Sequence, residues 1–313
     1  MAEREPTNLA ESLNQLTPKT KAPSSARILN AWITQAQDRL ATSGPRLSWL
    51  VAATVVSAAL QRAVDEHGSP LFLLKGGTLL QYRLPATSRS TRDIDGLVRG
   101  GIDEFLAELD KVLVAPWGPL TLMRGDVETI QVPSRIVKPR RFDIVVQLNG
   151  VTWRRVQVEV SPDEGQAGAA PENIRAPSLA GFGLPSPEHL TSLSMAYQIA
   201  QKVHACTDPH NPPALVNDRA RDVVDLLLLR DLTSETMSPT LVEVRAAIED
   251  IFATRASEAR RVGATPRTWP SRCIAHPHWV PSFASAADSA SLSVSLVDAV
   301  EELNFWLDLI ERA

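Results

Sequence analysis

The pattern of hydrophobic residues changes along the chain, and this change limits the folds that the chain can adopt. Between about residues 71 and 160, short apolar runs alternate with turn signals, which is typical of β-strands with a few helices between them. From about residue 187 onward the apolar residues recur with helical spacing. The pattern therefore predicts an α/β protein whose mixed α/β part is followed by a helical C-terminal part.

Turns and caps place the expected elements. Ser24 and Ser25 predict the start of a helix, which the Ser-Gly-Pro sequence at 43–45 ends. The Asn149-Gly150 pair predicts a hairpin turn within a β-rich stretch, 120–160. Further strands are expected at 71–74 and 94–98, and further helices at 47–67, 78–84, 103–113, 187–206, 213–231, 239–256 and 284–311.

Composition suggests where the domains divide. Residues 1–25 are rich in Pro, Lys, Thr and Ser, which predicts a flexible arm. A stretch rich in Pro, Gly and Ala, 161–187, predicts a loop or linker. We therefore expect a first domain over residues 26–180 and a helical C-terminal domain over residues 181–313.

Charge, cysteine content and hydropathy narrow the class of protein. The formal net charge of −4 argues against indiscriminate binding of nucleic acid, although a local basic groove remains compatible with it. The most apolar run, 47–60, is too short to span a membrane and is interrupted by serine and threonine. The two cysteines do not form a disulfide framework. We expect a cytoplasmic protein with no membrane partner.

A Gly76-Gly77 pair lies between an expected strand and an expected helix. Such a turn presents backbone N–H groups and a helix N-terminus to an anion. The spacing is neither that of a P-loop nor that of a dinucleotide-binding turn. Taken alone, the pair fits an ordinary tight turn equally well.

The Asp93-Ile94-Asp95 sequence supports an anion-binding function for the Gly76-Gly77 pair. Alternate residues of a strand share a face, so both carboxylates would lie side by side, with Ile94 pointing to the core. Two adjacent carboxylates repel each other unless a cation lies between them. Mg²⁺, or Mn²⁺, held by such carboxylates and by NTP phosphates is the usual arrangement for nucleotidyl transfer. A solvated or calcium-binding loop is the alternative. Arg89 and Arg92 could balance these charges or contact phosphate.

A third carboxylate could complete the group. Glu159 lies in one apolar strand sequence and Asp143 lies in another. Both are charged residues in stretches that otherwise suit a core. We favour Glu159, and Asp143 remains open.

Four segments in the same order resemble the AbiEii family, the nucleotidyltransferase toxins of type IV toxin–antitoxin and abortive-infection systems. The resemblance covers roughly residues 70–230 and does not include 1–45 or 256–313. The segments are Lys-Gly-Gly-Thr-Leu-Leu at 75–80, Arg-x-Thr-x-Asp-Ile-Asp at 89–95, Gln-Lys-Val-His-Ala at 201–205, and Arg-Ala-Arg-Asp-Val-Val-Asp-Leu at 219–226.

This resemblance implies a DNA polymerase β-like nucleotidyltransferase domain with a mixed sheet, and a helical C-terminal domain that closes over the site. It implies metal binding by Asp93 and Asp95. The implied catalytic residues are Asp93, Asp95, Lys202 and Asp222, with Glu159 as the third acid that we favour. The expected nucleotide-binding residues are Lys75, Gly76, Gly77, Thr78, Arg92, Lys202 and Arg219.

The resemblance also implies an activity. The expected reaction is Mg²⁺-dependent transfer of a nucleoside monophosphate from an NTP to an RNA 3′ hydroxyl, with the acceptor end of tRNA as the expected target. Blocked translation and a cognate antitoxin protein follow from the same resemblance. The alternatives are a kinase or protein-nucleotidylating enzyme that uses the same site, and a non-catalytic nucleotide-binding protein.

Ordinary structural roles compete for several residues. Lys202 could be an exposed helix lysine, Asp222 could pair with Arg219, and Arg221 could pair with Asp225. Zinc binding is conceivable but the spacings are not those of common sites. Its candidate ligands are His204, Cys206, His210, Cys273, His276 and His278.

Basic residues form candidate strips for RNA. They lie in Lys-Pro-Arg-Arg at 138–141, Trp-Arg-Arg at 153–155 and at five arginines between 255 and 272. A solvated surface explains these residues about as well, because the chain has 32 basic and 36 acidic residues.

Overall fold

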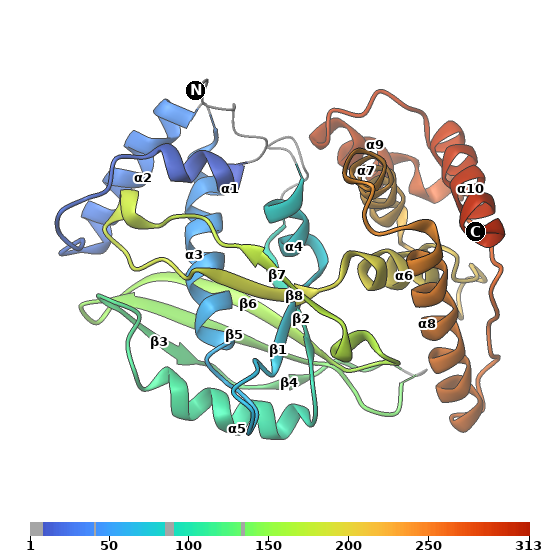
Figure 1. Ribbon diagram of the computed structural model, residues 1–313, viewed down its shortest axis with the longest axis horizontal. Coiled ribbons are helices and arrows are strands. Elements are labelled where there is room, and N and C mark those ends of the chain that lie inside the picture. Colours follow the sequence, from blue (N-terminus) through green and yellow to red (C-terminus); the bar gives the residue numbers. More distant parts are fainter. Residues whose placement is uncertain (1–8, 41, 85–90, 133–134) are drawn as a thin grey trace.

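A computed structural model describes residues 9–40, 42–84, 91–132 and 135–313 of the chain (Figure 1). The helices are α1 (Leu9–Ser12), α2 (Ala26–Leu40), α3 (Gly44–Leu60), α4 (Gly76–Arg83), α5 (Ile102–Leu113), α6 (Met195–Cys206), α7 (Ala220–Thr236), α8 (Leu241–Arg261), α9 (Val280–Ser289) and α10 (Leu296–Arg312). The strands are β1 (Phe72–Lys75), β2 (Asp93–Val98), β3 (Leu120–Arg124), β4 (Glu128–Thr129), β5 (Arg140–Leu148), β6 (Val151–Pro162), β7 (Pro171–Arg175) and β8 (His189–Leu193).

The strands of the described residues form one mixed sheet, as expected. Its order is β3-β5-β6-β2-β1-β8-β7, and β4 pairs with β5. The pairs β2–β6 and β1–β8 are parallel, whereas the other pairs are antiparallel. The predicted turn between β5 and β6 is confirmed, because Asn149 and Gly150 have φ values of 50° and 76°.

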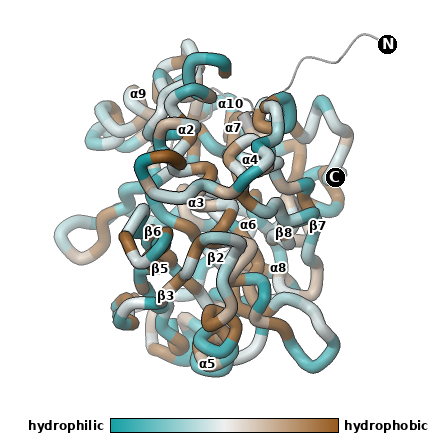
Figure 2. Tube along the Cα trace, turned by 90° about the vertical axis from the view of Figure 1, so that its left-hand side faces the viewer, coloured by the Kyte–Doolittle hydropathy of each residue, from teal (hydrophilic) through white to brown (hydrophobic). Residues whose placement is uncertain are grey.

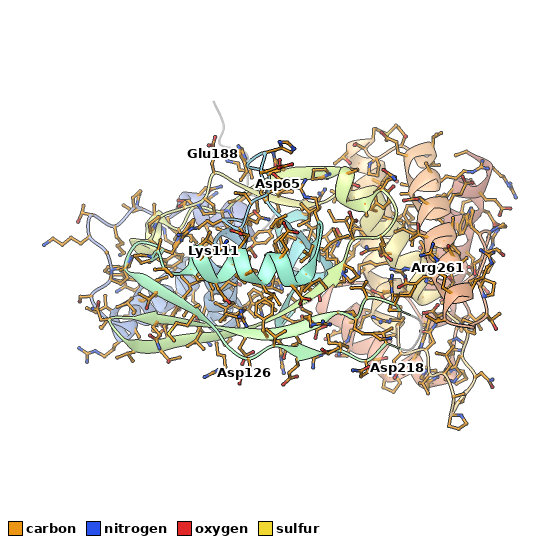
Figure 3. The ribbon with its side chains drawn as sticks, turned by 90° about the horizontal axis from the view of Figure 1, so that it is seen from below. Asp65, Lys111, Asp126, Glu188, Asp218 and Arg261 are labelled. Atoms are coloured by element: carbon orange, nitrogen blue, oxygen red, sulfur yellow. The ribbon has the colours of Figure 1, made fainter. Side chains whose placement is uncertain are left out.

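One face of the sheet is covered by α2, α3 and α5. Helix α3 is apolar on nearly all sides, so it is buried between the sheet and its neighbours. Ile94 of β2 belongs to the same core. Figure 2 traces these hydrophobic stretches through the molecule, and exposed charged side chains such as Lys111 of α5 appear in Figure 3. The opposite face of β2 is left for polar side chains.

Helices α6 to α10 form a second core beside the sheet (Figure 1). Leu80 of α4 and Leu84, directly after this helix, belong to this core. Helix α8 begins with a capping box, in which Thr240 and Glu243 satisfy each other's backbone N–H groups. The helical C-terminal part is therefore confirmed, and it packs directly onto the helix that follows the Gly76-Gly77 pair.

The boundary between sheet and helices differs from the expectation. The helix expected at 187–206 begins only at Met195, because His189–Leu193 forms strand β8 between β1 and β7. Ser194 caps α6 by accepting a hydrogen bond from the backbone N–H of Tyr197. The expected linker at 161–187 likewise contains strand β7. The predicted domain division at 180/181 stays a prediction, although the sheet itself continues to Leu193.

Three other helix predictions need correction. The helix expected at 284–311 is two helices, because Ser291 adopts a φ of 55° and Ser295 caps a new helix. The helix expected at 213–231 starts at Ala220, after a proline-containing loop. The helix expected at 47–67 ends at Leu60.

The described part of the expected flexible arm is packed against the sheet domain. Leu13 and Leu16 are buried in the core. The backbone N–H of Lys19 donates to the carbonyl of Ala180 at 2.9 Å. Residues 1–8 of the arm lie outside the described residues. No helix in the described part of the chain is long and apolar enough to cross a membrane.

Candidate active site

Strand β2 carries two half-buried carboxylates on the face that points away from the core. Asp93 and Asp95 alternate with the buried Ile94, as predicted from strand geometry. In the parallel register of β2 and β6, Asp95 lies beside Glu159 and Asp93 lies beside Gln157. The structure therefore places Asp93, Asp95 and Glu159 on one face of two neighbouring strands.

The register also separates the two candidates for the third acid. Asp143 of β5 lies opposite Gln157, so it is one strand farther from β2 than Glu159 is. Its nearest charged partner is Arg155, at 3.5 Å. Glu159 accepts a hydrogen bond from Arg141 Nε at 2.8 Å. Of the two acids, Glu159 is the one that the sheet brings next to Asp95.

The surroundings of Asp95 disfavour a bare negative charge. Burial raises the pKa of its carboxyl to about 6, and the charges of Asp93 and Glu159 act in the same direction while Lys75 opposes them. A cation between the carboxylates would relieve this cost, and carboxylate oxygens are the ligands that Mg²⁺ prefers. Asp93 is oriented by Thr91, whose Oγ1 donates to Oδ1 at 2.7 Å. Among the described residues, no group of three or more His, Cys, Asp or Glu side chains is arranged to hold a metal.

The turn at Gly76 packs directly against the side chain of Asp95. Gly76 has a φ of 65°, and a Cβ placed on it would lie 2.1 Å from Asp95 Oδ2. The close approach brings the first backbone N–H groups of α4 to the carboxylates. Thr78, predicted to contact the nucleotide, is buried and donates its hydroxyl to the carbonyl of Asp93 at 2.7 Å. This contact joins α4 to β2, which makes Thr78 a residue that positions the acids.

Substitution of Gly76 with alanine should therefore damage the site more than an ordinary glycine substitution. The added methyl group would collide with the Asp95 carboxylate, in addition to the strain of about 1–2 kcal/mol from the left-handed backbone. We expect a lowered melting temperature and loss of most of the activity that the site supports. Gly68→Ala is the matched control, since Gly68 has a φ of 78° and nothing within 4 Å of an added Cβ. Equal activity in the two variants would contradict the close packing of Gly76 on Asp95.

Lys75 precedes the turn and faces the same group of acids. Its Nζ donates to Ser161 Oγ at 2.7 Å. Burial lowers the pKa of the ammonium, while Glu164 and Asp95 raise it. The lysine therefore places a desolvated positive charge beside Asp95.

Helix α6 carries Lys202 into a buried ion pair with two acids of α7. Lys202 Nζ lies 2.7 Å from Asp222 Oδ1 and 2.7 Å from Asp225 Oδ2. Asp225 is fully buried. Asp222 also lies 4.0 Å from Arg219, so the pairing expected from helix spacing is present but is the longer of its two contacts.

The ion-pair partner of Asp225 was not predicted from the sequence. Spacing suggested a pair with Arg221, whereas the structure pairs Asp225 with Lys202 of another helix. The available signal was the apolar run around it, from Val223 to Leu227, in which a carboxylate must be paired to be buried.

A cavity of about 980 Å³ joins these elements between the sheet and the helices. Gln198 of α6 donates to the carbonyl of Gly76 at 3.0 Å, which fixes α6 against the turn. Arg92 is exposed and is not among the lining residues, and Arg89 lies outside the described residues. The predicted residues that line the cavity are Lys75, Gly76, Gly77, Asp95, Lys202, Arg219 and Asp222.

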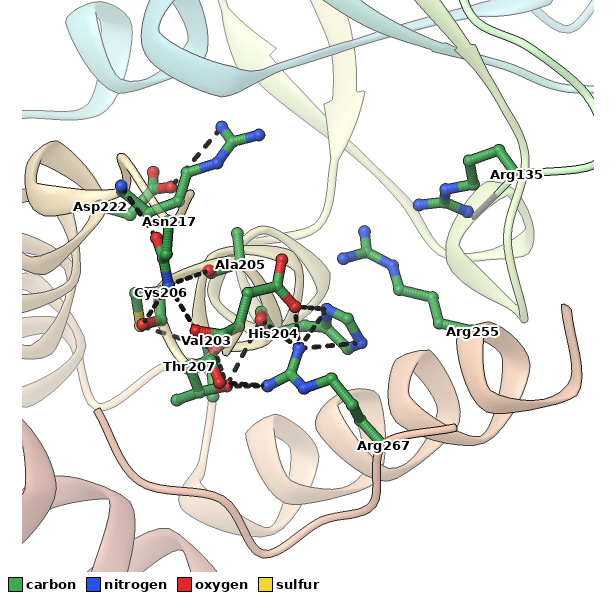
Figure 4. A network of polar contacts seen from close by, with 12 residues as sticks. Arg135, Val203, His204, Ala205, Cys206, Thr207, Asn217, Asp222, Arg255 and Arg267 are labelled. Carbon is green, nitrogen blue, oxygen red and sulfur yellow. Dashed lines mark hydrogen bonds and ion pairs between the residues drawn. The ribbon is translucent and has the colours of Figure 1, made fainter. Parts of the chain in front are cut away.

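The zinc candidates are divided between three places. Cys206 and Cys273 are buried together in the helical core. The ring of His210 stacks on that of His278 at 4.3 Å and lies tilted against that of His276 at 4.7 Å. His204 instead packs on Phe252 and contacts Arg267 (Figure 4). Within the described residues these side chains form no ligand cluster.

Many of the expected RNA-binding arginines are engaged in internal contacts. Arg272 pairs with Asp308 and Glu311. Arg267 is held by Asp208 and by the backbone carbonyl of Thr207 (Figure 4). The strips predicted from sequence are therefore less available than their composition suggests, although Arg255 and Arg267 line the cavity.

Comparisons with known proteins complete the description. The model of the AbiEii family, described as nucleotidyl transferase AbiEii toxin of the type IV toxin–antitoxin system, matches residues 58–290. The chain is also similar to MenT4, a nucleotidyltransferase toxin from Mycobacterium tuberculosis H37Rv, whose structure has been solved. The identity is 14% and the TM-score is 0.47, over 91% of this chain and 99% of the other. None of the curated proteins compared with the chain matches it.

Proposed function

Since the chain belongs to the AbiEii family of nucleotidyltransferase toxins of type IV toxin–antitoxin systems, we propose that it transfers a nucleoside monophosphate from an NTP to the 3′ hydroxyl of an RNA. One observation carries the proposal most strongly. The Gly76 turn, the Asp95 carboxylate and the Lys202 ion pair line one cavity, although they come from separate parts of the chain.

Each group has a proposed role in the reaction. Asp93 and Asp95 would hold Mg²⁺, which when bound would neutralise the charge of the phosphate oxygens. The backbone of Gly76 and Gly77 binds the phosphates at the N-terminus of α4. Lys202 and Arg219 neutralise phosphate charge. Lys75 adds a further positive charge, Glu159 is the third acid, and Asp222 keeps Lys202 in place.

The chemistry of the proposed step is a displacement at phosphorus. The acceptor 3′ oxygen bonds to the α-phosphorus, and the bond from that phosphorus to the oxygen of the β-phosphate breaks. The acceptor hydroxyl gives its proton to solvent water, and pyrophosphate leaves with the electrons of the broken bond. The protein contributes positions and charges, which is the main requirement of such transfers.

The proposed acceptor is a structured RNA, with tRNA as the expected example and blocked translation in the cytoplasm as the consequence. The formal net charge of −4 suits a protein that binds RNA at a confined basic place. The cavity provides such a place, because Arg135, Arg255 and Arg219 line it. A cognate antitoxin is the proposed protein partner.

Incubation of the pure protein with each α-labelled NTP, Mg²⁺ and total RNA tests this proposal. We expect label on an RNA band, released pyrophosphate, and no labelling after periodate oxidation of the RNA 3′ end. Added salt should reduce the transfer, since RNA binding releases counterions. Label on protein that periodate treatment leaves unchanged would show protein nucleotidylation instead. Transfer from γ-labelled but not α-labelled NTP would show a kinase.

A further inference from the structure

A buried glutamate just after β6 connects three elements that surround the cavity. Glu164 has a side chain that is 5% exposed. It accepts hydrogen bonds from Arg255 Nη2 of α8 at 2.7 Å and from Arg135 Nη2 at 2.8 Å. Gln201 of α6, the neighbour of Lys202 in sequence, donates to it at 2.7 Å. One carboxylate thus holds two guanidinium groups in fixed positions.

The contacts of Arg255 leave one of its terminal donor groups for a ligand, whereas Arg135 is fixed by two carboxylates. Arg255 contacts Glu164 through Nε and Nη2, so these contacts do not use its Nη1 group. Arg135 contacts Glu164 through Nη2 and Glu258 through Nη1, at 3.1 Å. Both arginines line the cavity, and Figure 4 shows that one comes from the segment before β5 and the other from α8.

The charges at this wall favour an anion. Glu164 and Glu258 together balance the charges of the two guanidinium groups, and the nearby ammonium of Lys75 leaves this wall with a positive excess. The same charges affect the pKa of His204. Burial lowers the pKa of its imidazole to about 2, and Arg255 and Arg267 add to the effect while Glu164 opposes it. The imidazole is therefore neutral at this wall, and the arginines provide the charge.

We propose that Arg135 and Arg255, held by Glu164, form a phosphate-binding subsite in addition to the turn at Gly76 and Gly77. A guanidinium held by a carboxylate on one edge presents a rigid donor group to phosphate, which it binds with more directional preference than an ammonium does. The cavity lining within the described residues contains no Phe, Tyr or Trp, so this wall suits a phosphate better than a stacked base. The phosphate belongs either to the NTP or to the acceptor strand, and this choice rests on the proposed function.

Arg255→Gln tests the subsite, and Arg230→Gln is the matched control. Arg230 is similarly shielded, with a side chain that is 25% exposed, and it pairs with Asp231 and Glu302 away from the cavity. Binding is measured by fluorescence anisotropy, without turnover. The probes are a labelled hairpin oligoribonucleotide with a single-stranded 3′ end and, separately, a labelled non-hydrolysable NTP analogue with Mg²⁺. Melting temperatures confirm that each variant is folded.

We expect Arg255→Gln to lower the affinity for one of the two probes about tenfold. The control variant should bind both probes as the wild type does. Weaker binding of the oligoribonucleotide, with the slope of log affinity against log salt concentration reduced by about 1, assigns the subsite to the acceptor strand. Weaker binding of the NTP analogue assigns it to the triphosphate. Arg255→Lys keeps the charge but not the planar donor edge, so it should restore less than half of the lost affinity.

Glu164→Gln tests how the subsite is held. This variant keeps both arginines but replaces the carboxylate that positions them, so the same probe should weaken. Unchanged binding of both probes in folded Arg255→Gln and Arg255→Lys would overturn the subsite. Because the probes report binding alone, this result is distinguishable from a wild-type protein that binds phosphates but transfers nothing, which would instead contradict the proposed function.

Discussion

Replacement of Asp95 with asparagine should abolish nucleotidyl transfer and leave the protein at least as stable as the wild type in metal-free buffer. The amide keeps the shape of the side chain but removes a charge that burial, Asp93 and Glu159 all disfavour. A neutral amide also lacks the charge that a Mg²⁺ ligand supplies. Turnover of α-labelled NTP and chemical denaturation with a chelator present are the two measurements.

The pH dependence provides an internal check on this prediction. The pKa of Asp95 is raised from 3.8 to about 6, so the folded state favours the protonated form. Its contribution to stability is present at pH below about 4 and is lost as the pH rises through about 6. The free energy of unfolding of Asp95→Asn should therefore exceed that of the wild type most at pH 7 to 8, by at most about 3 kcal/mol. Near pH 4 the two values should be similar. A folded variant that keeps wild-type transfer rates would contradict the proposed metal site.

Replacement of Lys202 with methionine should remove both activity and much of the stability. Methionine fills a similar space but leaves Asp222 and Asp225 without the ammonium that lies 2.7 Å from each. Removal of one partner from a buried ion pair costs about 3–5 kcal/mol. We expect a large fall in the denaturation midpoint and transfer below detection.

A second substitution separates the two effects. In Lys202→Met with Asp225→Asn, the fully buried carboxylate is neutral, so a substantial part of the stability should return. Transfer should stay lost, because the ammonium proposed to neutralise phosphate is still missing. Lys202→Arg should also fail to restore full activity, since a longer planar group does not reproduce a compact charge. A stable double variant with normal transfer would assign Lys202 a structural role alone.

Local patterns predicted the parts of the site that depend on local geometry. Alternation in a strand was enough to place Asp93 and Asp95 on one face, and the glycine pair indicated a close backbone approach. The position of Glu159 beside Asp95 depends on the parallel register of two strands, which a single sequence does not specify. The contact between Glu164 and Arg255 joins residues 91 positions apart, so spacing carries no signal for it.

The predicted boundary between the sheet and the C-terminal helices was wrong, because it also depends on contacts between distant residues. The sequence before Met195 contains short apolar runs that periodicity alone does not assign to strand or helix. Its assignment as β8 depends on the open edge of β1, which lies more than one hundred positions earlier in the chain. Tertiary pairing decides the conformation of such a segment, as it decides that Asp225 pairs with Lys202 instead of with its own helix.

The pairing of β1 with β8 also has a consequence for synthesis on the ribosome. Strands β1, β2 and β6 can associate early, but one edge of β1 stays uncovered until residues His189–Leu193 have emerged. The ammonium of Lys202 and its buried partner Asp225 follow later still. Folding of a growing chain proceeds from the N-terminal side. A nascent chain that already displays the carboxylates therefore lacks a completed cavity until the helices that close it have been made.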